Sequence, residues 1–290
     1  KTSLTREEFI KNVMELNLAI AGQTGNLAPA DKKLYALRDV TATVNSIPLI
    51  ASRIMNKKND SGADKILLDV KTGSGALIKN IDESIMLAEE MVSIGKQNGR
   101  ETVAVITDMD IPLGNAIGNG LEVKEAIDTL KGNGPKDLEA VCIELAARML
   151  ELAGKGEVEE CRKLAKEKIA DGSAINKFGE FAMRQGAEYL PWDERAIPKA
   201  PVVEEVKSPF NGYIGSIKAD IAGKASMMLG AGRETKESSI DYSAGIILHK
   251  KTGDLVRKGE VIAELHTSDS NKIKEAKEML LGAVTPSAEP

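Results

Sequence analysis

The chain has 290 residues, which corresponds to about two domains of ordinary size and leaves room for a buried core. Its 39 Lys and Arg residues against 44 Asp and Glu residues give a net charge of −5, and no basic stripe interleaved with aromatic residues is present. This composition disfavours nucleic acid as a partner. No apolar run approaches the ~20 residues of a membrane span, so we expect no membrane partner. Two cysteines cannot form a disulfide framework, which favours a reducing, cytoplasmic compartment.

The N-terminal residues predict a helix. Thr5 and Glu8 have the spacing of a capping box, and residues 9–16 carry apolar side chains at helical intervals. We expect this apolar stripe to pack against the rest of the protein. The first eight residues contain neither an initiator Met nor an apolar signal segment, and we expect the sequence to be part of a longer chain.

Two adjoining helices are predicted after a polar loop at residues 22–26. The first begins near Pro29 and carries Tyr35 and Arg38, and the second has Pro48 in its first turn and continues through Ile54.

The pattern then changes to that of an α/β layer domain. An apolar strand at residues 66–70, a glycine-rich turn at 72–75, a helix at 82–96 and a strand at 102–106 predict a βαβ unit. Further helices are predicted at residues 121–130, 137–152 and 158–169.

A second module is predicted beyond a boundary near Ile197. Pro198 and Pro201 indicate a linker, and the short apolar segments that follow are separated by turn glycines, which predicts a small β-rich barrel or sandwich. From Asn271 onward we expect one exposed helix and a polar tail.

The two adjoining helices present a possible ligand-binding face. Tyr35 and Arg38 are three residues apart and Arg53 and Lys57 are four apart, so each pair shares one helix face, and Ile50 joins the second face. Three cations and one aromatic ring suit a planar ligand whose edge carries carbonyl oxygens. The alternative is a solvated helix surface, which is the common position of Lys and Arg.

The turn at residues 71–75 allows two interpretations. Backbone N–H groups after a strand can bind phosphate, but the turn lacks the full spacing of known phosphate-binding motifs. Glycines also serve any tight turn between a strand and a helix, so a structural turn is equally compatible with the sequence.

The cysteines and histidines suggest no catalytic or zinc site. Cys142 and Cys161 fall within helical patterns, and we expect buried, inert thiols. His249 and His266 are seventeen residues apart in the second module, without a partner at zinc-site spacing.

Several long segments resemble the pyrimidine-nucleoside phosphorylase and thymidine phosphorylase family. The similarity begins at residues 29–52 (PADKKLYALRDVTATVNSIPLIAS) and covers nearly the whole chain. It continues in DVKTGSGA at residues 69–76, PLGNAIGN at 112–119 and LGAGR at 229–233. These motifs resemble the bacterial enzymes that act on both uridine and thymidine more than the strict thymidine enzymes.

The resemblance implies reversible phosphorolysis of uridine, thymidine or deoxyuridine to a pentose 1-phosphate and the free base. Inorganic phosphate is the implied co-substrate and no organic cofactor is needed. The positions that match the family's base contacts are Tyr35, Arg38, Ile50, Arg53 and Lys57. Arg38 and Lys57 are the implied catalytic residues, because fixed cations stabilise the anionic charge on a departing pyrimidine.

The resemblance also implies an architecture: a mixed-sheet α/β domain, part of an all-helical lobe, and a C-terminal α+β, hammerhead-like, β-rich domain. We expect α/β segments at residues 1–28 and 59–197, a helical-lobe segment at 29–58 and the C-terminal domain at 198–290. A homodimer joined through the helical lobes is the implied assembly.

Two departures from the family pattern are visible. Arg53 replaces the usual serine, and a guanidinium cannot accept a hydrogen bond, so base binding is weakened, base preference is altered or Arg53 turns outward. The family's Lys-x-Ser-Thr-Gly-Gly phosphate loop has no counterpart in these residues. We therefore expect this segment alone to be inactive, either as part of a longer enzyme or as a non-catalytic binding module.

Some relatives hold a structural potassium or calcium ion, and the matching ligands here are the carbonyls of Leu113 and Ala116 and the carboxylate of Glu125. Glu125 on a helix is equally compatible with a solvated carboxylate. A more distant resemblance to biotinyl and lipoyl carriers directs attention to Lys250 and Lys251, although their position before a turn departs from that of a modified lysine.

Overall fold

The structure is a computed structural model that describes residues 2–21, 46–60, 62–233 and 238–289. The chain forms two compact units. Unit 1 comprises residues Lys1–Thr72, Ile78–Thr107 and Val141–Glu188, and unit 2 comprises Gly73–Leu77, Asp108–Ala140 and Tyr189–Pro290. The expected α/β architecture with a C-terminal β-containing domain is confirmed.

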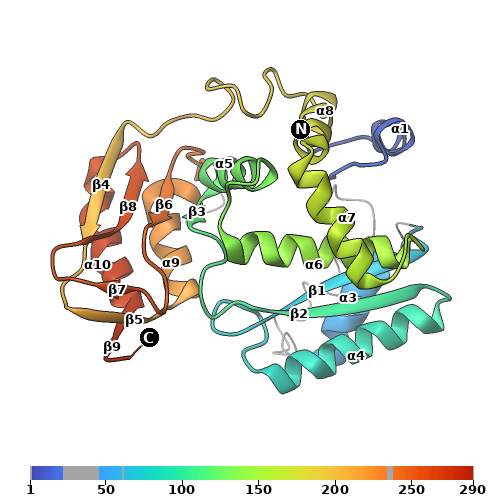
Figure 1. Cartoon of the computed structure of the whole chain (residues 1–290), viewed down its shortest axis with the longest axis horizontal. Coiled ribbons are helices and arrows are strands. Elements are labelled where there is room, and N and C mark those ends of the chain that lie inside the picture. Colours follow the sequence, from blue (N-terminus) through green and yellow to red (C-terminus); the bar gives the residue numbers. More distant parts are fainter. Residues whose placement is uncertain (1, 22–45, 61, 234–237, 290) are drawn as a thin grey trace. The chain divides into compact units, whose positions relative to one another are not determined.

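Unit 1 contains a two-stranded sheet with helices on both faces (Figure 1). The predicted βαβ unit is present as β1 (Lys65–Thr72), α4 (Ile81–Gln97) and β2 (Glu101–Asp108). Its other helices are α1 (Arg6–Leu16), α3 (Ile47–Asp60), the part of α6 (Lys136–Leu152) from Val141 onward, α7 (Val158–Ala170) and α8 (Ser173–Arg184). No sequence pattern predicted α8.

The alternation of side chains along β1 builds the core of unit 1. Ile66, Leu68 and Val70 are buried on the face that α3 and α4 cover. The opposite face carries Lys65, Leu67 and Asp69, which line a groove of about 330 Å³ together with Leu145, Met149 and Leu152 of α6. One strand thus packs on one side and opens to a groove on the other.

The capping box of α1 is confirmed, but the predicted packing of its apolar stripe is wrong. Thr5 accepts from the Glu8 N–H at 3.2 Å, and Glu8 accepts from the Thr5 N–H at 2.8 Å. Along the helix, however, Ile10, Val13 and Met14 are exposed, and Asn12 is the buried residue. Capping depends on four neighbouring residues, whereas packing depends on what lies opposite the helix.

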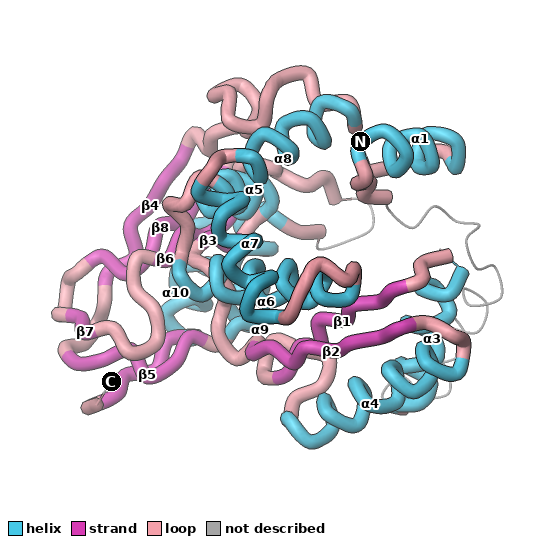
Figure 2. The backbone as a smooth tube through the Cα atoms, turned by 45° about the vertical axis from the view of Figure 1, so that its right-hand side comes forward, coloured by secondary structure: helices cyan, strands magenta, loops and turns pink. Residues whose placement is uncertain are grey.

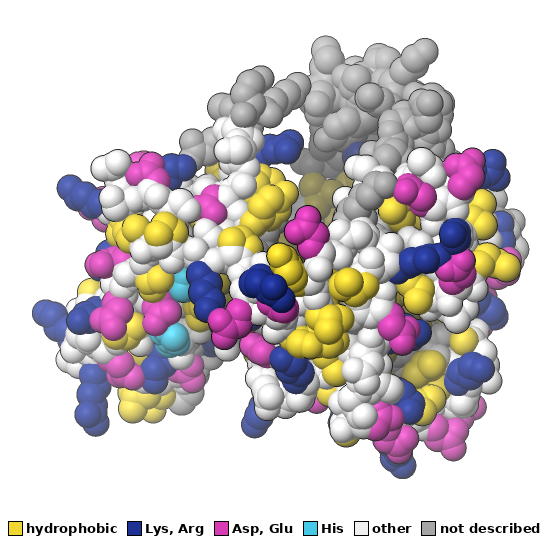
Figure 3. Space-filling view, turned by 90° about the horizontal axis from the view of Figure 1, so that it is seen from above, with side chains coloured by type: hydrophobic (Ala, Val, Ile, Leu, Met, Phe, Trp, Pro, Cys, Tyr) yellow, Lys and Arg dark blue, Asp and Glu magenta, His cyan; other side chains and the backbone are white. Residues whose placement is uncertain are grey.

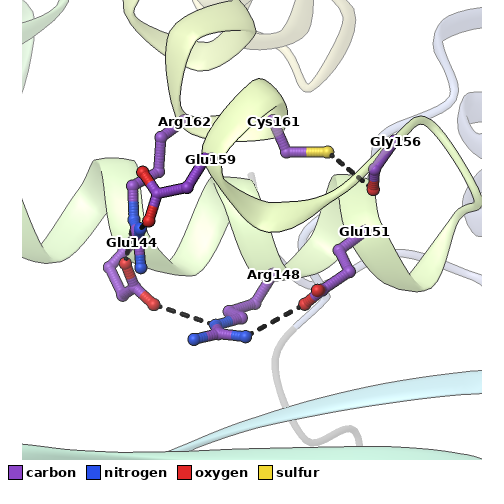
Figure 4. Close-up of polar contacts among 7 residues, drawn as sticks. All are labelled: Glu144, Arg148, Glu151, Gly156, Glu159, Cys161 and Arg162. Carbon is purple, nitrogen blue, oxygen red and sulfur yellow. Dashed lines mark hydrogen bonds and ion pairs between the residues drawn. The ribbon is translucent and has the colours of Figure 1, made fainter.

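A network of ion pairs joins α6 to α7 (Figure 4). Glu144 accepts from Arg148 at 2.9 Å and from Arg162 at 2.7 Å, and Arg148 also contacts Glu151. The hydrogen bond from Arg162, together with Arg148, lowers the pKa of Glu144 below its ordinary value. Because one carboxylate accepts from two guanidinium groups on two helices, Glu144 links α6 to α7.

Unit 2 contains two antiparallel sheets (Figure 2). The first has the strand order β3-β6-β8-β4 and the second β7-β5-β9. The strands of the first sheet are β3 (Ala116–Ile117), β6 (Gly245–Leu248), β8 (Val261–Thr267) and β4 (Val202–Lys207). Those of the second are β7 (Leu255–Val256), β5 (Gly212–Ile217) and β9 (Val284–Ser287).

Helices complete the core of unit 2. They are α5 (Asn119–Leu130), α9 (Ala219–Ser226), the π-helical turn η1 (Met227–Ala231), the short 3₁₀ turn η2 (Ser270–Lys272) and α10 (Ile273–Ala283). Ala222 of α9 and Leu280 of α10 are buried in the same apolar cluster as Ile246 and Leu265 of the first sheet.

The expectation for the C-terminus was wrong in two respects. The helix α10 buries Ala276, Leu280 and Ala283 rather than lying exposed. The residues after it form β9, which pairs with β5, so that Ile217 lies opposite Val284. No sequence pattern predicted α9. The pairing of β9 with β5 joins residues about seventy positions apart, which local periodicity does not report.

The core of unit 2 gives a direct test of packing. Leu265 is 0% exposed and Leu255 is 57% exposed, so they form a matched pair within one unit. We expect Leu265→Ala to lower the free energy of unfolding by about 2–5 kcal/mol, because it opens a cavity, and Leu255→Ala to change it by less than about 0.5 kcal/mol. Urea denaturation measures both, and equal losses would contradict the assigned core.

Candidate functional site

The predicted base-binding residues belong to the sequence of unit 1. Tyr35 and Arg38 lie outside the described residues. Ile50, Arg53 and Lys57 are part of α3, and the side chain of Lys57 is also outside the description. The confirmed helix places Arg53 three residues after Ile50 and Lys57 one turn further on. Their joint role as a binding face stays a prediction.

Packing divides α3 into a buried stripe and a flank. Ile50, Ala51 and Met55 are buried against β1 and α4, with exposed fractions of 6%, 0% and 0%. Arg53 is half-buried. Because successive residues turn by about 100° in a helix, Arg53 projects from the edge of the buried stripe. Ile50 itself is held in the core.

The N–H groups of the glycine-rich turn after β1 are bonded to oxygens of the protein itself. The Ser74 N–H donates to Asp110 Oδ1 at 2.7 Å, and the Gly75 N–H donates to the Met109 carbonyl at 2.9 Å. Gly73 has a φ of +117°, and a Cβ there would meet the Asp110 backbone nitrogen at 2.7 Å. Because protein oxygens accept these N–H groups, the structure favours the structural interpretation over the phosphate cradle.

A polar cluster that the sequence analysis missed lies at the end of β1. Lys71 Nζ lies 2.7 Å from Asp69 Oδ2 and donates to Thr107 Oγ1 at 2.8 Å. Thr107 Oγ1 in turn donates to Asp69 Oδ1 at 2.5 Å. The two-residue spacing of Asp69 and Lys71 on one strand face was the available signal. The partner on β2 could not be read from the sequence.

Unit 2 brings two family-like motifs together. Asn119 Nδ2 donates to the Ala231 carbonyl at 2.6 Å, which joins the motif at residues 112–119 to that at 229–233. Ser226 Oγ donates to the Ile117 carbonyl at 2.7 Å. Residues more than a hundred positions apart therefore form one local arrangement, although neither motif predicts the other's position.

Glu125 lies beneath the loop of residues 112–116, which we call the 112–116 loop. Its Oε1 accepts from the N–H groups of Asn115 at 2.8 Å and Ala116 at 3.0 Å. Burial and the charge of Asp137 raise the pKa of Glu125, and the two backbone hydrogen bonds and Lys251 oppose that rise. Glu125 is thus a half-buried, hydrogen-bonded carboxylate rather than a freely solvated one.

The predicted cation ligands lie on one loop and one helix. Ala116 is buried in β3, Leu113 is 36% exposed, and Glu125 belongs to α5. Gly114 has a φ of +71°, and a Cβ there would lie 2.2 Å from Glu125 Oε2, so only glycine allows this close approach. Their joint binding of a cation stays a prediction.

Both lysines considered as carrier lysines are engaged by carboxylates. Lys250 pairs with Glu260 at 2.9 Å, and Lys251 pairs with Asp137. An amine held in an ion pair is poorly placed as an exposed site for a covalent prosthetic group, so these contacts disfavour the carrier interpretation.

The cysteines differ in their surroundings. Cys161 is 1% exposed, as predicted, and its thiol donates to the Gly156 carbonyl at 3.4 Å (Figure 4). Burial and three nearby glutamates raise the pKa of Cys161. Cys142 is exposed, so the expectation of two buried thiols was wrong for this residue. Its position on α6 lies outside the apolar stripe that packs in the core.

The two histidines face a shared carboxylate on the first sheet of unit 2. Nε2 of His249 lies 3.2 Å from Glu264 Oε1, and Nε2 of His266 lies 3.4 Å from Glu264 Oε2. Burial lowers the pKa of His266. Figure 3 shows the two imidazoles, in cyan, close to acidic side chains.

Comparison with known proteins identifies the family of this chain. Residues 1–175 match the model of the glycosyl transferase family a/b domain, and residues 213–287 match the pyrimidine nucleoside phosphorylase C-terminal domain. A pyrimidine-nucleoside phosphorylase from Geobacillus stearothermophilus is 50% identical over 289 residues, which cover 99% of this chain and 66% of that protein. The chain belongs to the pyrimidine-nucleoside phosphorylase family.

Other pyrimidine-nucleoside phosphorylases are similar to this chain over most of its length. The pyrimidine-nucleoside phosphorylase of Staphylococcus haemolyticus strain JCSC1435 is 50% identical over 291 residues, which cover 98% of this chain and 67% of the relative. That of Staphylococcus epidermidis strain ATCC 12228 is 53% identical over 267 residues, covering 91% and 62%. This chain therefore spans about two thirds of the length of its phosphorylase relatives.

Membrane-spanning helices and clusters of metal-binding side chains are both absent from residues 2–21, 46–60, 62–233 and 238–289. No helix in these ranges combines the length and apolar character needed to cross a membrane. Within the same ranges, no three His, Cys, Asp or Glu side chains are grouped so that they could hold a metal ion.

The glycine-rich turn can be tested by adding a methyl group. We expect Gly73→Ala to lower the free energy of unfolding by about 1–3 kcal/mol, because its positive φ is strained for alanine and the added Cβ meets Asp110. Gly99→Ala is the matched control, since Gly99 has a φ of +69° but no atom within 4 Å of the added Cβ. A greater urea sensitivity of Gly99→Ala would contradict the assigned turn.

Proposed function

We propose that the protein carrying this chain catalyses phosphorolysis of pyrimidine nucleosides. The observation that carries this proposal is the 50% identity with pyrimidine-nucleoside phosphorylases over 99% of the chain, including the α3 segment with Ile50, Arg53 and Lys57. The products are a pentose 1-phosphate and free uracil or thymine. Inorganic phosphate is the co-substrate, and no organic cofactor takes part.

The reaction exchanges one bond for another. A phosphate oxygen bonds to C1′ of the pentose while the bond from C1′ to the base nitrogen breaks. The bonding electron pair leaves with the pyrimidine, which takes up the proton that hydrogen phosphate gives up as it becomes the phosphate ester. Because negative charge spreads over the departing ring, groups that bind the anion more tightly than the neutral nucleoside lower the barrier.

Arg38 and Lys57 are the proposed catalytic residues, as donors to the departing base. Tyr35 is proposed to flank the ring and Arg53 to stand at its edge. Ile50, which is 6% exposed, is proposed to contact the base only with the small part of its side chain that reaches the surface. The helix α3 supports this arrangement because its buried stripe anchors it to β1, which gives a fixed backbone to the residues on its flank. A cytoplasmic homodimer is the proposed form of the protein.

The activity test uses this chain joined to an upstream segment that carries the family's phosphate loop. We expect release of uracil from uridine only when inorganic phosphate is present. We expect Arg38→Ala and Lys57→Ala each to lower kcat/KM by an amount equivalent to about 2–4 kcal/mol of barrier, as for other donors to a developing anion. Measurement of free base and pentose 1-phosphate by chromatography gives both quantities.

Lys163→Ala is the control for loss of a positive charge, because Lys163 is exposed on α7. We expect it to retain the parental kcat/KM. Full activity of Arg38→Ala and Lys57→Ala would remove these residues from the mechanism. Release of base without phosphate would instead identify a hydrolase and refute phosphorolysis.

The serine usually found at the position of Arg53 allows a second measurement. A hydroxyl both donates and accepts, whereas a guanidinium only donates. If Arg53 lies at the ring edge, Arg53→Ser restores one hydrogen bond of about 1 kcal/mol, and KM for uridine falls about fivefold with little change in kcat. An unchanged KM would indicate that Arg53 does not contact the base.

A further inference from the structure

Lys251 reaches the 112–116 loop from the end of β6. Its Nζ donates to the carbonyls of Pro112 at 2.9 Å and Gly114 at 2.7 Å, and also to the Asp137 carboxylate. An ammonium group has three N–H donors, and all three have an oxygen acceptor here. The Lys251 side chain is only 20% exposed. Such complete hydrogen bonding is typical of a charge with a structural task.

The backbone of Lys251 is held in place independently of the side-chain ammonium group. The backbone N–H of Lys251 donates to Asp254 Oδ2 at 2.7 Å within the turn that follows β6. In the same region, the Leu248 N–H donates to the Asn115 carbonyl at 2.8 Å. The side chain therefore extends from an anchored backbone towards the loop.

The N–H groups of the 112–116 loop contact carboxylates, and its carbonyls contact an ammonium group. Its Asn115 and Ala116 N–H groups donate to Glu125, and its Gly114 N–H donates to Asp137 Oδ2 at 3.1 Å. Its carbonyls at Pro112 and Gly114 accept from Lys251. The backbone dipoles of the loop are thus oriented between two carboxylates and one ammonium group.

The carboxylates and carbonyls of this cluster are all negative or partly negative groups, so a positive group among them stabilises it. Burial raises the pKa of Asp137, but the hydrogen bond and the charge of Lys251 outweigh it and hold that pKa below its ordinary value. Asp137 and Glu125 accept from N–H groups of the same loop, Asp137 from Gly114 and Glu125 from Asn115 and Ala116. Without Lys251, the Asp137 carboxylate and the carbonyls of Pro112 and Gly114 would lose the positive group that they share.

The expected metal ligands fit this arrangement poorly. One oxygen of Glu125 already accepts two N–H groups, and the carbonyls on either side of Leu113 point to an ammonium group. A metal ion beside Leu113 would also be repelled by the Lys251 ammonium group, which the carbonyls of the two neighbouring residues hold.

We propose that Lys251 is the built-in cation of the 112–116 loop, taking the place of a bound metal ion. It is a positioning residue: it holds the loop carbonyls and Asp137 and thereby keeps the loop amides on Glu125. This inference goes beyond the proposed phosphorolysis. Its test measures stability and loop opening, so its failure would leave the phosphorolysis proposal untouched.

The first experiment is chemical rescue in the 290-residue chain. Lys251→Ala removes the ammonium group and leaves space for a small cation. We expect its melting temperature to fall, and methylammonium chloride to recover at least about half of the loss by binding the vacated oxygens, whereas choline chloride at equal ionic strength does not. Equal recovery with both salts, or no fall on substitution, would overturn the proposal.

Lys250→Ala is the matched control, because the neighbouring lysine pairs with Glu260 and has no contact with the loop among the described interactions. We expect a smaller fall and no difference between methylammonium and choline. Specific rescue of Lys250→Ala would also overturn the proposal, since the effect would then not arise at the loop.

The second experiment keeps the volume of the side chain. In Lys251→Met we expect amide hydrogen exchange at Asn115 and Ala116 to accelerate by at least about tenfold, while exchange in β8 stays as in the parent. This variant decides the matter if Lys251→Ala does not fold. Unchanged exchange at the two loop amides would refute the role of the ammonium group.

The metal alternative is tested on the parent chain. We expect calcium and potassium chlorides to change its melting temperature no more than choline chloride does at equal ionic strength. A saturable rise with either metal ion that is lost in Glu125→Gln would show that a metal ion stabilises the loop, and would overturn the proposal.

Discussion

The burial of one stripe of α3 against β1 and α4 is the constraint on which the proposed base site depends. Ile50, Ala51 and Met55 leave water together, and each fully buried side chain of this kind contributes about 1.5–3 kcal/mol when it is large. A helix anchored in this way cannot rotate about its axis without exposing the stripe. The direction in which Arg53 projects is therefore set by apolar packing rather than by its own charge.

Local signals in the sequence predicted local structure well. The capping box at Thr5 and Glu8 and the βαβ pattern around α4 are confirmed, because each is determined by residues close in the chain. The exposure of Met14 and the pairing of β9 with β5 were not predictable in this way. Both depend on which distant segment lies opposite, and a single sequence does not record that partner.

The candidate sites show the same division. The glycines drew attention to the turn at residues 71–75, and the family resemblance drew attention to Glu125. What each one does depends on Asp110 and Lys251, which lie 36 and 126 residues away. The same turn sequence is compatible with N–H groups that bind phosphate and with N–H groups that donate to Asp110. Hydrogen-bond partners, rather than motifs, decide between these interpretations.

Lys250 and Lys251 illustrate the limit most clearly, because two adjacent residues of the same type have different tasks. Their side chains diverge: Lys250 reaches Glu260, whereas Lys251 reaches the 112–116 loop. From composition alone, both lysines would be expected to be solvated charges. From the resemblance to carrier proteins, both would be candidate modification sites. Only the positions of Pro112, Gly114 and Asp137 distinguish a surface ion pair from an ammonium group with every donor used, and that distinction assigns the positive charge of the loop to the chain itself.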